Sequence, residues 1–127
     1  MLKTSSRLTR ILTKNAICRG DIFLVDLDPV LGSEQGKTRP CVIIQNDLGN
    51  QYSPVTIIAC ITSTVSRRAY PTNVFVTAKE TGLDHDSVVI LNQIRSVDKT
   101  RLIKKLGAVP QAKMLEVDAA LRISLNL

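Results

Sequence analysis

The chain has 127 residues, a formal net charge of +6 at pH 7, 3% aromatic residues and no tryptophan. A chain of this length forms one domain, and it buries roughly two-thirds of its unfolded surface, enough for stability without disulfides or a structural metal. Scarce aromatic side chains argue against a single-strand binder that stacks bases on aromatic platforms. The aromatic residues are Phe23, Phe75, Tyr52 and Tyr70.

Positive charge is concentrated at the N-terminal end. Residues 1–19 contain five basic and no acidic residues, whereas residues 20–127 contain 12 basic and 11 acidic residues. Residues 20–127 are therefore nearly neutral. This argues against electrostatic binding of nucleic acid over a broad surface but is compatible with a local phosphate-binding patch. Eight of these 12 cations fall into three groups: Lys37 and Arg39; Arg67 and Arg68; and Lys99, Arg101, Lys104 and Lys105.

The first 18 residues, MLKTSSRLTRILTKNAIC, are basic and rich in serine and threonine. They formally resemble a transit peptide, yet they lack the continuous apolar region of a secretion signal. We interpret residues 1–18 as a flexible or partly helical extension, followed by a single domain over residues 19–127. No run of the chain approaches the about 20 apolar residues that span a bilayer, and the expected location is the cytoplasm.

The first half of the domain has the pattern of three strands separated by polar loops. Residues 21–28, DIFLVDLD, alternate between two faces and end at Pro29, which is typical of a strand. A second apolar run covers residues 41–47, and residues 48–54 have the composition of a loop. Residues 55–62, VTIIACIT, are the most β-branched and apolar run of the chain, which predicts a central strand covered on both faces.

Short elements are also predicted for the second half. In chain order they are a polar loop at 63–71, a strand at 72–78, a turn at 79–86, a long strand at 87–97, a single turn at 98–102 capped by Asp98, and a short strand at 103–109. Within the long strand, Asn92, Gln93 and Arg95 interrupt the apolar pattern. They indicate a bend or a functional rim.

A change of period follows Pro110. Met114, Val117, Leu121 and Leu125 are spaced by three to four residues, which predicts an amphipathic C-terminal helix packed on the sheet. Five to seven short strands and one terminal helix predict a mostly β fold, a small and mostly antiparallel barrel. Such a barrel offers chemistry at its loops.

The cysteines and the single histidine do not form a recognisable metal or catalytic motif. Cys18, Cys41 and Cys60 are odd in number and lack CxxC spacing, so buried thiols in a reducing compartment are the preferred interpretation, with metal or redox roles as alternatives. His85 lies between acids in GLDHDS and is expected to be a solvated turn residue. One histidine makes neither a zinc site nor a paired-histidine acid–base couple. We therefore expect no metal ion and no cofactor.

The most polar loop of the first half, GSEQGKTRP at residues 32–40, is longer than chain reversal requires. Gly32 and Gly36 permit unusual backbone angles and close approach of a ligand. The polar side chains between them can bind base edges, and the cations after them can bind phosphate. These polar residues are Ser33, Glu34, Gln35, Lys37 and Arg39.

Several segments together resemble a known family. The run RGDIFLVDLDPVLGSEQGKTRPCVIIQND is followed by SPVTIIACITS, YPTNV, DSVVILNQIRSVDKTRL and VDAALRISL, with the signatures GSEQG, TRP and AxIT in order. From Arg19 to Leu127 the chain resembles the MazF/PemK family of toxin–antitoxin ribonucleases. The resemblance implies an SH3-like antiparallel barrel of the CcdB/MazF type with a C-terminal α-helix. It also implies a homodimer that cuts single-stranded RNA, including mRNA, at short motifs without metal, leaving 2′,3′-cyclic phosphate and 5′-hydroxyl ends.

The same resemblance implies that Arg39 and Thr62 are the catalytic pair. Their chemistry is suited to this, because a guanidinium can donate two hydrogen bonds to the charge that grows on a phosphorane, and a hydroxyl can hold the same phosphate in line. Attack by the 2′-hydroxyl of the RNA needs no enzyme nucleophile. Arginine is a poor general base, so Glu34 is the candidate base or 2′-hydroxyl orienter.

Further RNA contacts are expected around this pair. Ser33, Glu34, Gln35 and Lys37 belong to the same loop. Asn46 and Gln93 are candidates for base recognition, with binding of loop backbone as the alternative for both. Arg67 and Arg68 are candidates for flanking phosphates, with ordinary surface charge as the alternative.

The expected partner is a MazE-like antitoxin whose acidic, disordered tail covers the cleft of the toxin. Two other functions are compatible with the fold. One is a noncatalytic CcdB-like toxin that poisons gyrase, since a fold does not determine function. The other is an inactive or regulatory member that only binds RNA or antitoxin. Arg39 together with Thr62 favours the nuclease.

Overall fold

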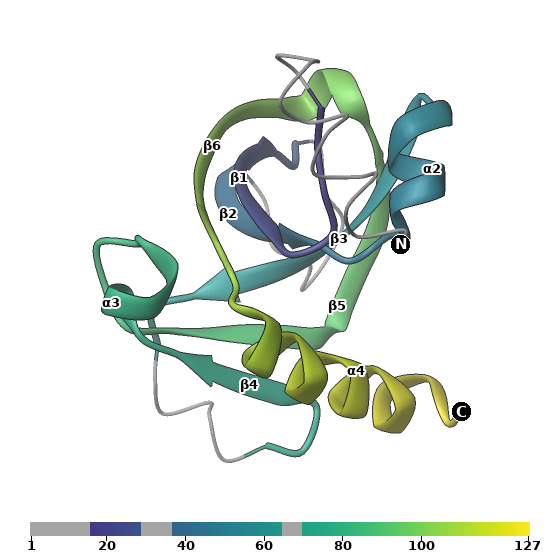
Figure 1. Ribbon diagram of the computed structural model, residues 1–127. Helices are drawn as coiled ribbons and strands as arrows, with labels where there is room; N and C mark the ends of the chain where they lie inside the picture. Colours follow the sequence, from purple (N-terminus) through teal and green to yellow (C-terminus); the bar gives the residue numbers. More distant parts are fainter. Residues whose placement is uncertain (1–15, 29–36, 65–69) are drawn as a thin grey trace.

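The computed structural model describes residues 16–28, 37–64 and 70–127. Six strands and four short or long helical segments follow one another in this part of the chain (Figure 1). Their bounds are β1 Asp21–Asp26, β2 Thr38–Ile43, α2 Asp47–Tyr52, β3 Val55–Thr62, β4 Asn73–Val76, α3 Ala78–Thr81, β5 Ser87–Asp98, η2 Lys99–Arg101, β6 Leu102–Ala108 and α4 Gln111–Leu125. The prediction of a mostly β chain that ends in a helix is confirmed.

The strands form one antiparallel sheet in the order β4-β5-β3-β2-β1-β6. Figure 1 shows the sheet curling so that β6 arches over β1 and β2. The two edge strands, β4 and β6, do not pair with each other within the described residues. The predicted barrel is therefore a strongly curled open sheet. Its centre is β3, which covers residues 55–62 as predicted and lies between β2 and β5.

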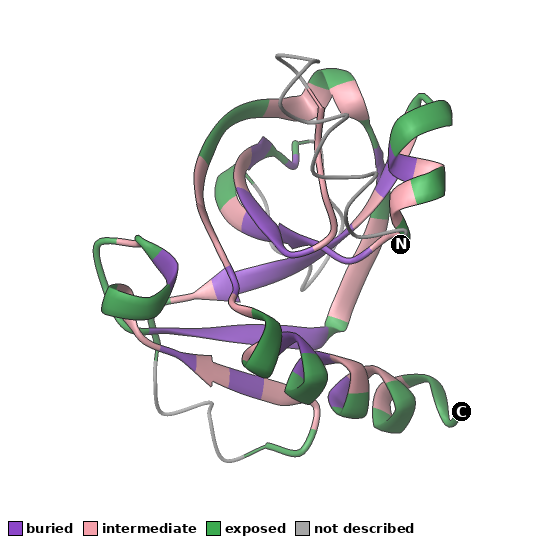
Figure 2. Ribbon diagram, in the orientation of Figure 1, coloured by how far each residue is buried: buried purple, intermediate pink, exposed green. Residues whose placement is uncertain are grey.

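Both faces of the central strands are buried, as Figure 2 shows for β2, β3 and β5. One face contributes to a helix-side core, which contains Val42 and Ala59 and is covered by α4 through Met114, Val117 and Ala120. The opposite face contributes to a second core, made of Val25, Leu27, Cys41, Ile43, Ile58, Cys60 and Val97. Alternate residues of one strand enter different cores, which explains why the central strands have continuous apolar runs.

The C-terminal helix α4 begins just after Pro110, as predicted. Met114 and Val117 are buried and Leu121 packs against the helix-side core. Leu125, which shares their spacing, is instead 51% exposed. Figure 1 shows the last turn of α4 projecting beyond the strands. The apolar spacing of the helix therefore continues where no strand lies beneath it to be covered.

Two segments predicted as a loop and a turn contain helices. Residues 48–54 mostly belong to α2, which starts because the Asn46 side chain accepts a hydrogen bond from the Gly49 N–H at 2.7 Å. Residues 79–86 begin within α3, where Thr77 and Glu80 form a capping box. Both predictions were wrong because capping side chains outweighed the high content of turn-forming residues.

The other local predictions are close to the structure. The second strand, β2, begins at Thr38 rather than after Pro40, because residues 38–40 already pair with β1. The interruption predicted in the long strand is a bulge: Ala59 pairs with Ile94, but Cys60 pairs with Ile90. Asp98 caps the single turn η2, as expected. The hydrogen bonds that this cap receives from Thr100 lower the pKa of the Asp98 carboxyl.

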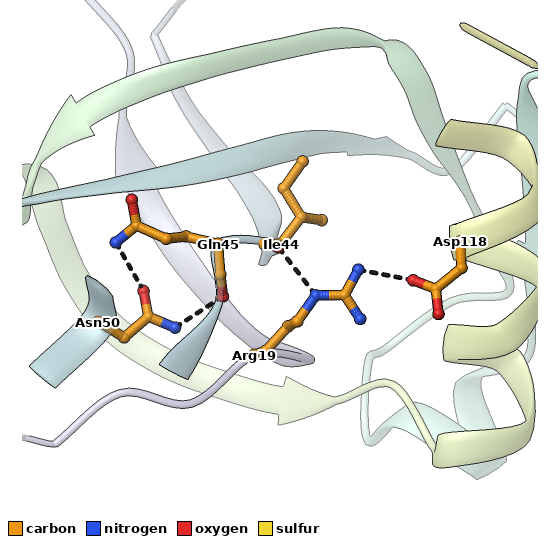
Figure 3. Close-up of polar contacts among 5 residues, drawn as sticks. All are labelled: Arg19, Ile44, Gln45, Asn50 and Asp118. Atoms are coloured by element: carbon orange, nitrogen blue, oxygen red, sulfur yellow. Dashed lines mark hydrogen bonds and ion pairs between the residues drawn. The ribbon is translucent and has the colours of Figure 1, made fainter. Parts of the chain in front are cut away.

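Arg19 ties the first described segment to two distant elements. Its guanidinium donates to the Ile44 carbonyl at 2.8 Å and to Asp118 of α4 at 2.6 Å, as Figure 3 shows. Its backbone N–H donates to Asp47 at 2.6 Å. Both side chains of the ion pair are partly buried, with 28% and 36% of their surface exposed. The chain thus enters the fold at a fixed point beside α4.

A second polar cluster fixes α2 on the sheet. Asn50, buried in the helix, donates to the Gln45 carbonyl at 3.0 Å and accepts from the Gln45 side chain at 3.1 Å. The Asn50 oxygen also accepts from the buried Thr56 hydroxyl at 2.8 Å. Figure 3 shows the Gln45–Asn50 part of this cluster next to the Arg19 contacts. These bonds explain why a short helix persists at the end of β2.

We predict that Asp118→Ala lowers the free energy of unfolding by about 1–2 kcal/mol, because Arg19 loses a charged partner in a partly buried site. Urea unfolding followed by circular dichroism measures this. Glu116→Ala is the matched control on α4, since the Glu116 side chain is 56% exposed and its 3.4 Å contact with Lys113 contributes less than about 0.5 kcal/mol. Equal losses in the two variants would contradict the role given to Arg19.

Candidate active site

The base of the loop that the sequence predicted as a substrate clamp is firmly built. The Lys37 N–H donates to the Asp28 carboxylate at 2.7 Å, and the Lys37 carbonyl accepts from the Leu27 N–H at 2.7 Å. Lys37 itself has a left-handed backbone, with φ of 59°. These contacts join the two ends of segment 29–36, and we call them the loop stem. Ser33, Glu34 and Gln35 lie outside the described residues.

Arg101 closes the stem from another part of the chain. Its guanidinium donates to the Asp26 carbonyl at 3.1 Å and also to the Asp28 carbonyl. Because the acceptors are carbonyls, these bonds hold the stem without neutralising the positive charge of Arg101. The cluster of cations that the sequence showed after residue 98 therefore includes one residue with a structural contact to the loop.

The register of β2 and β3 brings the predicted catalytic residues to the same end of the sheet. Cys41 and Cys60 are the last pair of the β2–β3 ladder, and Arg39 and Thr62 each lie two residues beyond this pair, toward the same end of the two neighbouring strands. Along β2 the backbone groups alternate in direction. The Ile44 N–H donates to the Ile57 carbonyl next to β3 at 2.9 Å, whereas the Ile43 carbonyl accepts from the Gly20 N–H just before β1. Odd-numbered positions of β2 therefore face β3 as non-hydrogen-bonded pairs, where side chains approach most closely.

The two side chains of this pair differ in their surroundings. Arg39 is exposed, so its guanidinium is available to a ligand. Thr62 ends β3 and is half-buried, and its oxygen accepts from the Thr64 N–H at 3.2 Å. That bond fixes the hydroxyl while leaving its hydrogen available to donate. A flexible cation and an oriented hydroxyl therefore lie on neighbouring strand ends.

A further guanidinium, that of Arg95, lies below this pair. Arg95 pairs with Ile58 across β5 and β3, is half-buried, and donates to the Leu27 carbonyl at 3.3 Å. It was not among the predicted site residues. The signal was present in the sequence, because an arginine interrupts an otherwise apolar strand. Its place next to the second core makes it a fixed positive charge under the site.

Cys41 and Cys60 are buried, as predicted, whereas Cys18 is partly exposed. The Cys41 sulfur lies 3.6 Å from the Arg39 carbonyl. A hydrogen bond with Cys60 and burial raise the pKa of the Cys41 thiol. The same hydrogen bond lowers the pKa of Cys60, and the positive charges of Arg95 and Arg39 act in the same direction. Of the two thiols, Cys60 is therefore the one whose ionisation its surroundings favour.

The other residues that the sequence singled out have varied surroundings. Asn46 caps α2 through its oxygen, which is the backbone-binding alternative given for it. Gln93 is half-buried in the bulge of β5, and its side-chain oxygen has no hydrogen-bond partner among the described residues. His85 is exposed in a turn, as expected. Arg67 and Arg68 lie outside the described residues.

No group of three or more histidine, cysteine, aspartate or glutamate residues lies close enough together to hold a metal ion in residues 16–28, 37–64 and 70–127. In the same residues no helix has the length and apolarity needed to cross a membrane.

Comparison with known proteins places the chain in a family. Residues 18–125 match the family described as PemK-like, MazF-like toxin of type II toxin-antitoxin system. A curated relative, Endoribonuclease MazF of Staphylococcus epidermidis, is 55% identical over 111 residues, which cover 87% of this chain and 92% of the relative.

Solved structures agree with this assignment. An endoribonuclease in complex with its cognate antitoxin from Mycobacterial species has a TM-score of 0.73 at 26% identity, covering 88% of this chain and 97% of that one. MazF from Deinococcus radiodurans has a TM-score of 0.75 at 24% identity, covering 88% and 98% of the two chains, and supports the fold alone. From the extent of these matches, the chain belongs to the PemK-like, MazF-like toxins of type II toxin–antitoxin systems.

Proposed function

We propose that this toxin-family endoribonuclease cuts single-stranded RNA, mRNA in particular, by attack of a ribose 2′-hydroxyl on the adjacent phosphate. The products are a 2′,3′-cyclic phosphate and a 5′-hydroxyl end, and the cut falls at a short sequence motif without the help of a metal ion. The observation that supports this most strongly is that Arg39 and Thr62 each lie two residues beyond the Cys41–Cys60 pair, at the same end of neighbouring strands. A gyrase poison would have no need of this pair.

Charge stabilisation is the task that we assign to Arg39. As the 2′-oxygen attacks, negative charge grows on the phosphorane oxygens, and a guanidinium donates two directed hydrogen bonds to them. The exposure of Arg39 lets it meet a phosphate that arrives from solvent. Arg95 lies below and adds positive potential without occupying the same place, since its guanidinium is bound to Leu27.

Positioning is the task that we assign to Thr62. Its oxygen is held by the Thr64 N–H, so its O–H has a restricted direction. A donor of fixed direction can keep the phosphate in line between the attacking and the leaving oxygen. The nucleophile belongs to the RNA, so the site needs no serine or cysteine nucleophile.

Proton transfer and base recognition are assigned to the clamp loop. Glu34 is our candidate for the base that receives the 2′-hydroxyl proton. Ser33, Gln35 and Lys37 would bind the nucleotides beside the cut, and the loop stem gives these residues a fixed starting point. Gln93, whose oxygen has no partner among the described residues, is retained as an acceptor for a base.

Regulation follows from the same surface. One relative with a similar structure was solved with its cognate antitoxin. We propose that a MazE-like antitoxin covers this site with an acidic segment, which the guanidinium groups of Arg39, Arg95 and Arg101 would attract, since none of them has a carboxylate ion pair within the described residues. We also propose a homodimer acting in the cytoplasm. The exposed apolar residues Leu115 and Ile123 of α4 are available for contacts between subunits.

We predict that Arg39→Ala lowers kcat/KM for RNA cleavage by about 10²–10³-fold, because one charge-stabilising group is lost. Thr62→Val should cost about tenfold or more through misplacement of the phosphate. The assay is end mapping on a long, weakly structured RNA in EDTA. Arg122→Ala, which removes an exposed arginine from α4, is the matched control and should cut at the wild-type rate.

The pattern of ends decides the mechanism as well as the rate. Cyclic phosphate ends at one motif, lost in Arg39→Ala but kept in Arg122→Ala, are expected. An intact RNA, or cleavage that EDTA abolishes, would contradict the proposal and would turn attention to gyrase.

A separate prediction concerns the loop stem. Arg101→Ala should lower kcat/KM by about tenfold, because the carbonyls of Asp26 and Asp28 lose the group that holds them together. Lys104→Ala is the matched control, since it removes the same charge from exposed β6. If both variants lose activity equally, and added salt removes the difference from wild type, Arg101 acts by charge alone and the stem has no role.

A further inference from the structure

Cys41 and Cys60 are the one chemically reactive pair of the described residues that the proposed mechanism does not use. They lie directly opposite each other on β2 and β3, one step inward from Arg39 and Thr62. Both belong to the second core, with 0% and 3% of their surfaces exposed. The sequence separates them by 18 residues and gives no CxxC motif, so only the fold reveals the dithiol.

The backbone geometry suits a bond between the two sulfurs. Because Ile44 and Ile57 are a hydrogen-bonded pair, Cys41 and Cys60, three positions further along the ladder, are a non-hydrogen-bonded pair. Cα atoms of such pairs lie about 4.5 Å apart, within the range of about 4.4–6.8 Å found in disulfides. Their burial also prevents either thiol from reaching a thiol of another molecule. The only accessible partner of each sulfur is the other.

The surroundings of the pair favour the reactive form of one thiol. The thiolate, not the thiol, attacks oxidants, and positive charge stabilises it. Arg95 and Arg39 supply that charge, and the hydrogen bond between the sulfurs lowers the pKa of Cys60. Cys60 is therefore the attacking sulfur and Cys41 the resolving one.

We propose that Cys41 and Cys60 form an oxidisable dithiol that closes into a disulfide between β2 and β3 and thereby slows RNA cleavage. The oxidant is hydrogen peroxide. The Cys60 thiolate attacks one peroxide oxygen, the O–O bond breaks, and hydroxide leaves as a sulfenic acid forms. The Cys41 sulfur then attacks the Cys60 sulfur, the S–S bond forms and the S–O bond breaks. The two hydroxides that leave take up the two thiol protons and become two water molecules. In sum, two thiols are oxidised to one disulfide and one peroxide is reduced to water.

Two contacts connect this bond to the catalytic pair. The Cys41 sulfur, 3.6 Å from the Arg39 carbonyl, can donate its hydrogen there, and oxidation removes that hydrogen. The covalent link would fix β2 to β3 two residues inward from Arg39 and Thr62, so these side chains could no longer adjust to the phosphate by relative movement of the two strands. This effect on cleavage rests on the proposed function, whereas the formation of the disulfide does not.

The test uses the full chain, reduced and then exposed to hydrogen peroxide. Non-reducing peptide mapping by mass spectrometry should find the peptides of Cys41 and Cys60 joined, with the loss of two hydrogen atoms. Cleavage of RNA should fall about tenfold and return after dithiothreitol. Cys18→Ser keeps the dithiol and should behave like the wild type. Cys41→Val and Cys60→Ala should show no joined peptides and no change of rate with peroxide.

Each result decides one part of the proposal. Wild-type protein in which peroxide oxidises Cys18 while Cys41 and Cys60 stay reduced would overturn the dithiol. Joined peptides with an unchanged cleavage rate would overturn its effect on the active site. If the reduced protein cuts no RNA, the proposed function and this effect fall together, while peptide mapping still decides whether the disulfide forms. The wild type and Cys18→Ser suffice for these decisions if a core variant fails to fold.

Discussion

The register between β2 and β3 is the constraint on which the fold and the site both depend. It places Val42 and Ala59 in the helix-side core and Cys41 and Cys60 in the second core. Arg39 and Thr62 each lie two residues beyond the last pair of this register, toward the same strand ends. A slip by one residue would turn every side chain of a strand to the opposite face, so two apolar cores prevent it. The apolar side chains buried in the two cores thereby determine where the polar residues at the strand ends lie.

The arginine side chains differ in the kind of group that they bind. Arg19 is paired with the carboxylate of Asp118, which largely cancels its charge. Arg95 and Arg101 instead donate to backbone carbonyls and have no carboxylate ion pair within the described residues. A carbonyl fixes a guanidinium without removing its positive charge. Positive potential therefore collects beside Arg39 although the body of the protein is nearly neutral, which suits the binding of phosphate.

Much of the fold follows from local sequence patterns. The apolar run at 55–62, the interruption at Asn92 and Gln93, the Asp98 cap and the helix after Pro110 were all predicted from such patterns. The helices α2 and α3 were missed, because they are held by a few specific side-chain bonds, such as the caps at Asn46 and Thr77. Composition averages over several residues and so does not register one well-placed side chain.

The site was predicted less completely than the fold. Arg39 and Thr62 came from the resemblance to a family, and the structure adds the register that brings them together. Arg95 and Arg101 were visible as charges, but their carbonyl partners Leu27 and Asp28 are more than 65 residues away in sequence. Likewise, the pairing of Cys41 with Cys60 depends on strand order. Such long-range contacts leave no local pattern, so they require the three-dimensional structure.

The contact of Arg19 with Asp118 joins residues 99 positions apart. On the ribosome, β1 and β2 emerge long before α4, and the stem waits for Arg101, 73 residues after Asp28. A nascent chain therefore lacks the Arg19–Asp118 contact and the contacts of Arg101 with the loop stem until translation is nearly complete. The order of the contacts along the chain therefore makes the loop stem and the Arg19 contact late events in the folding of a newly synthesised chain.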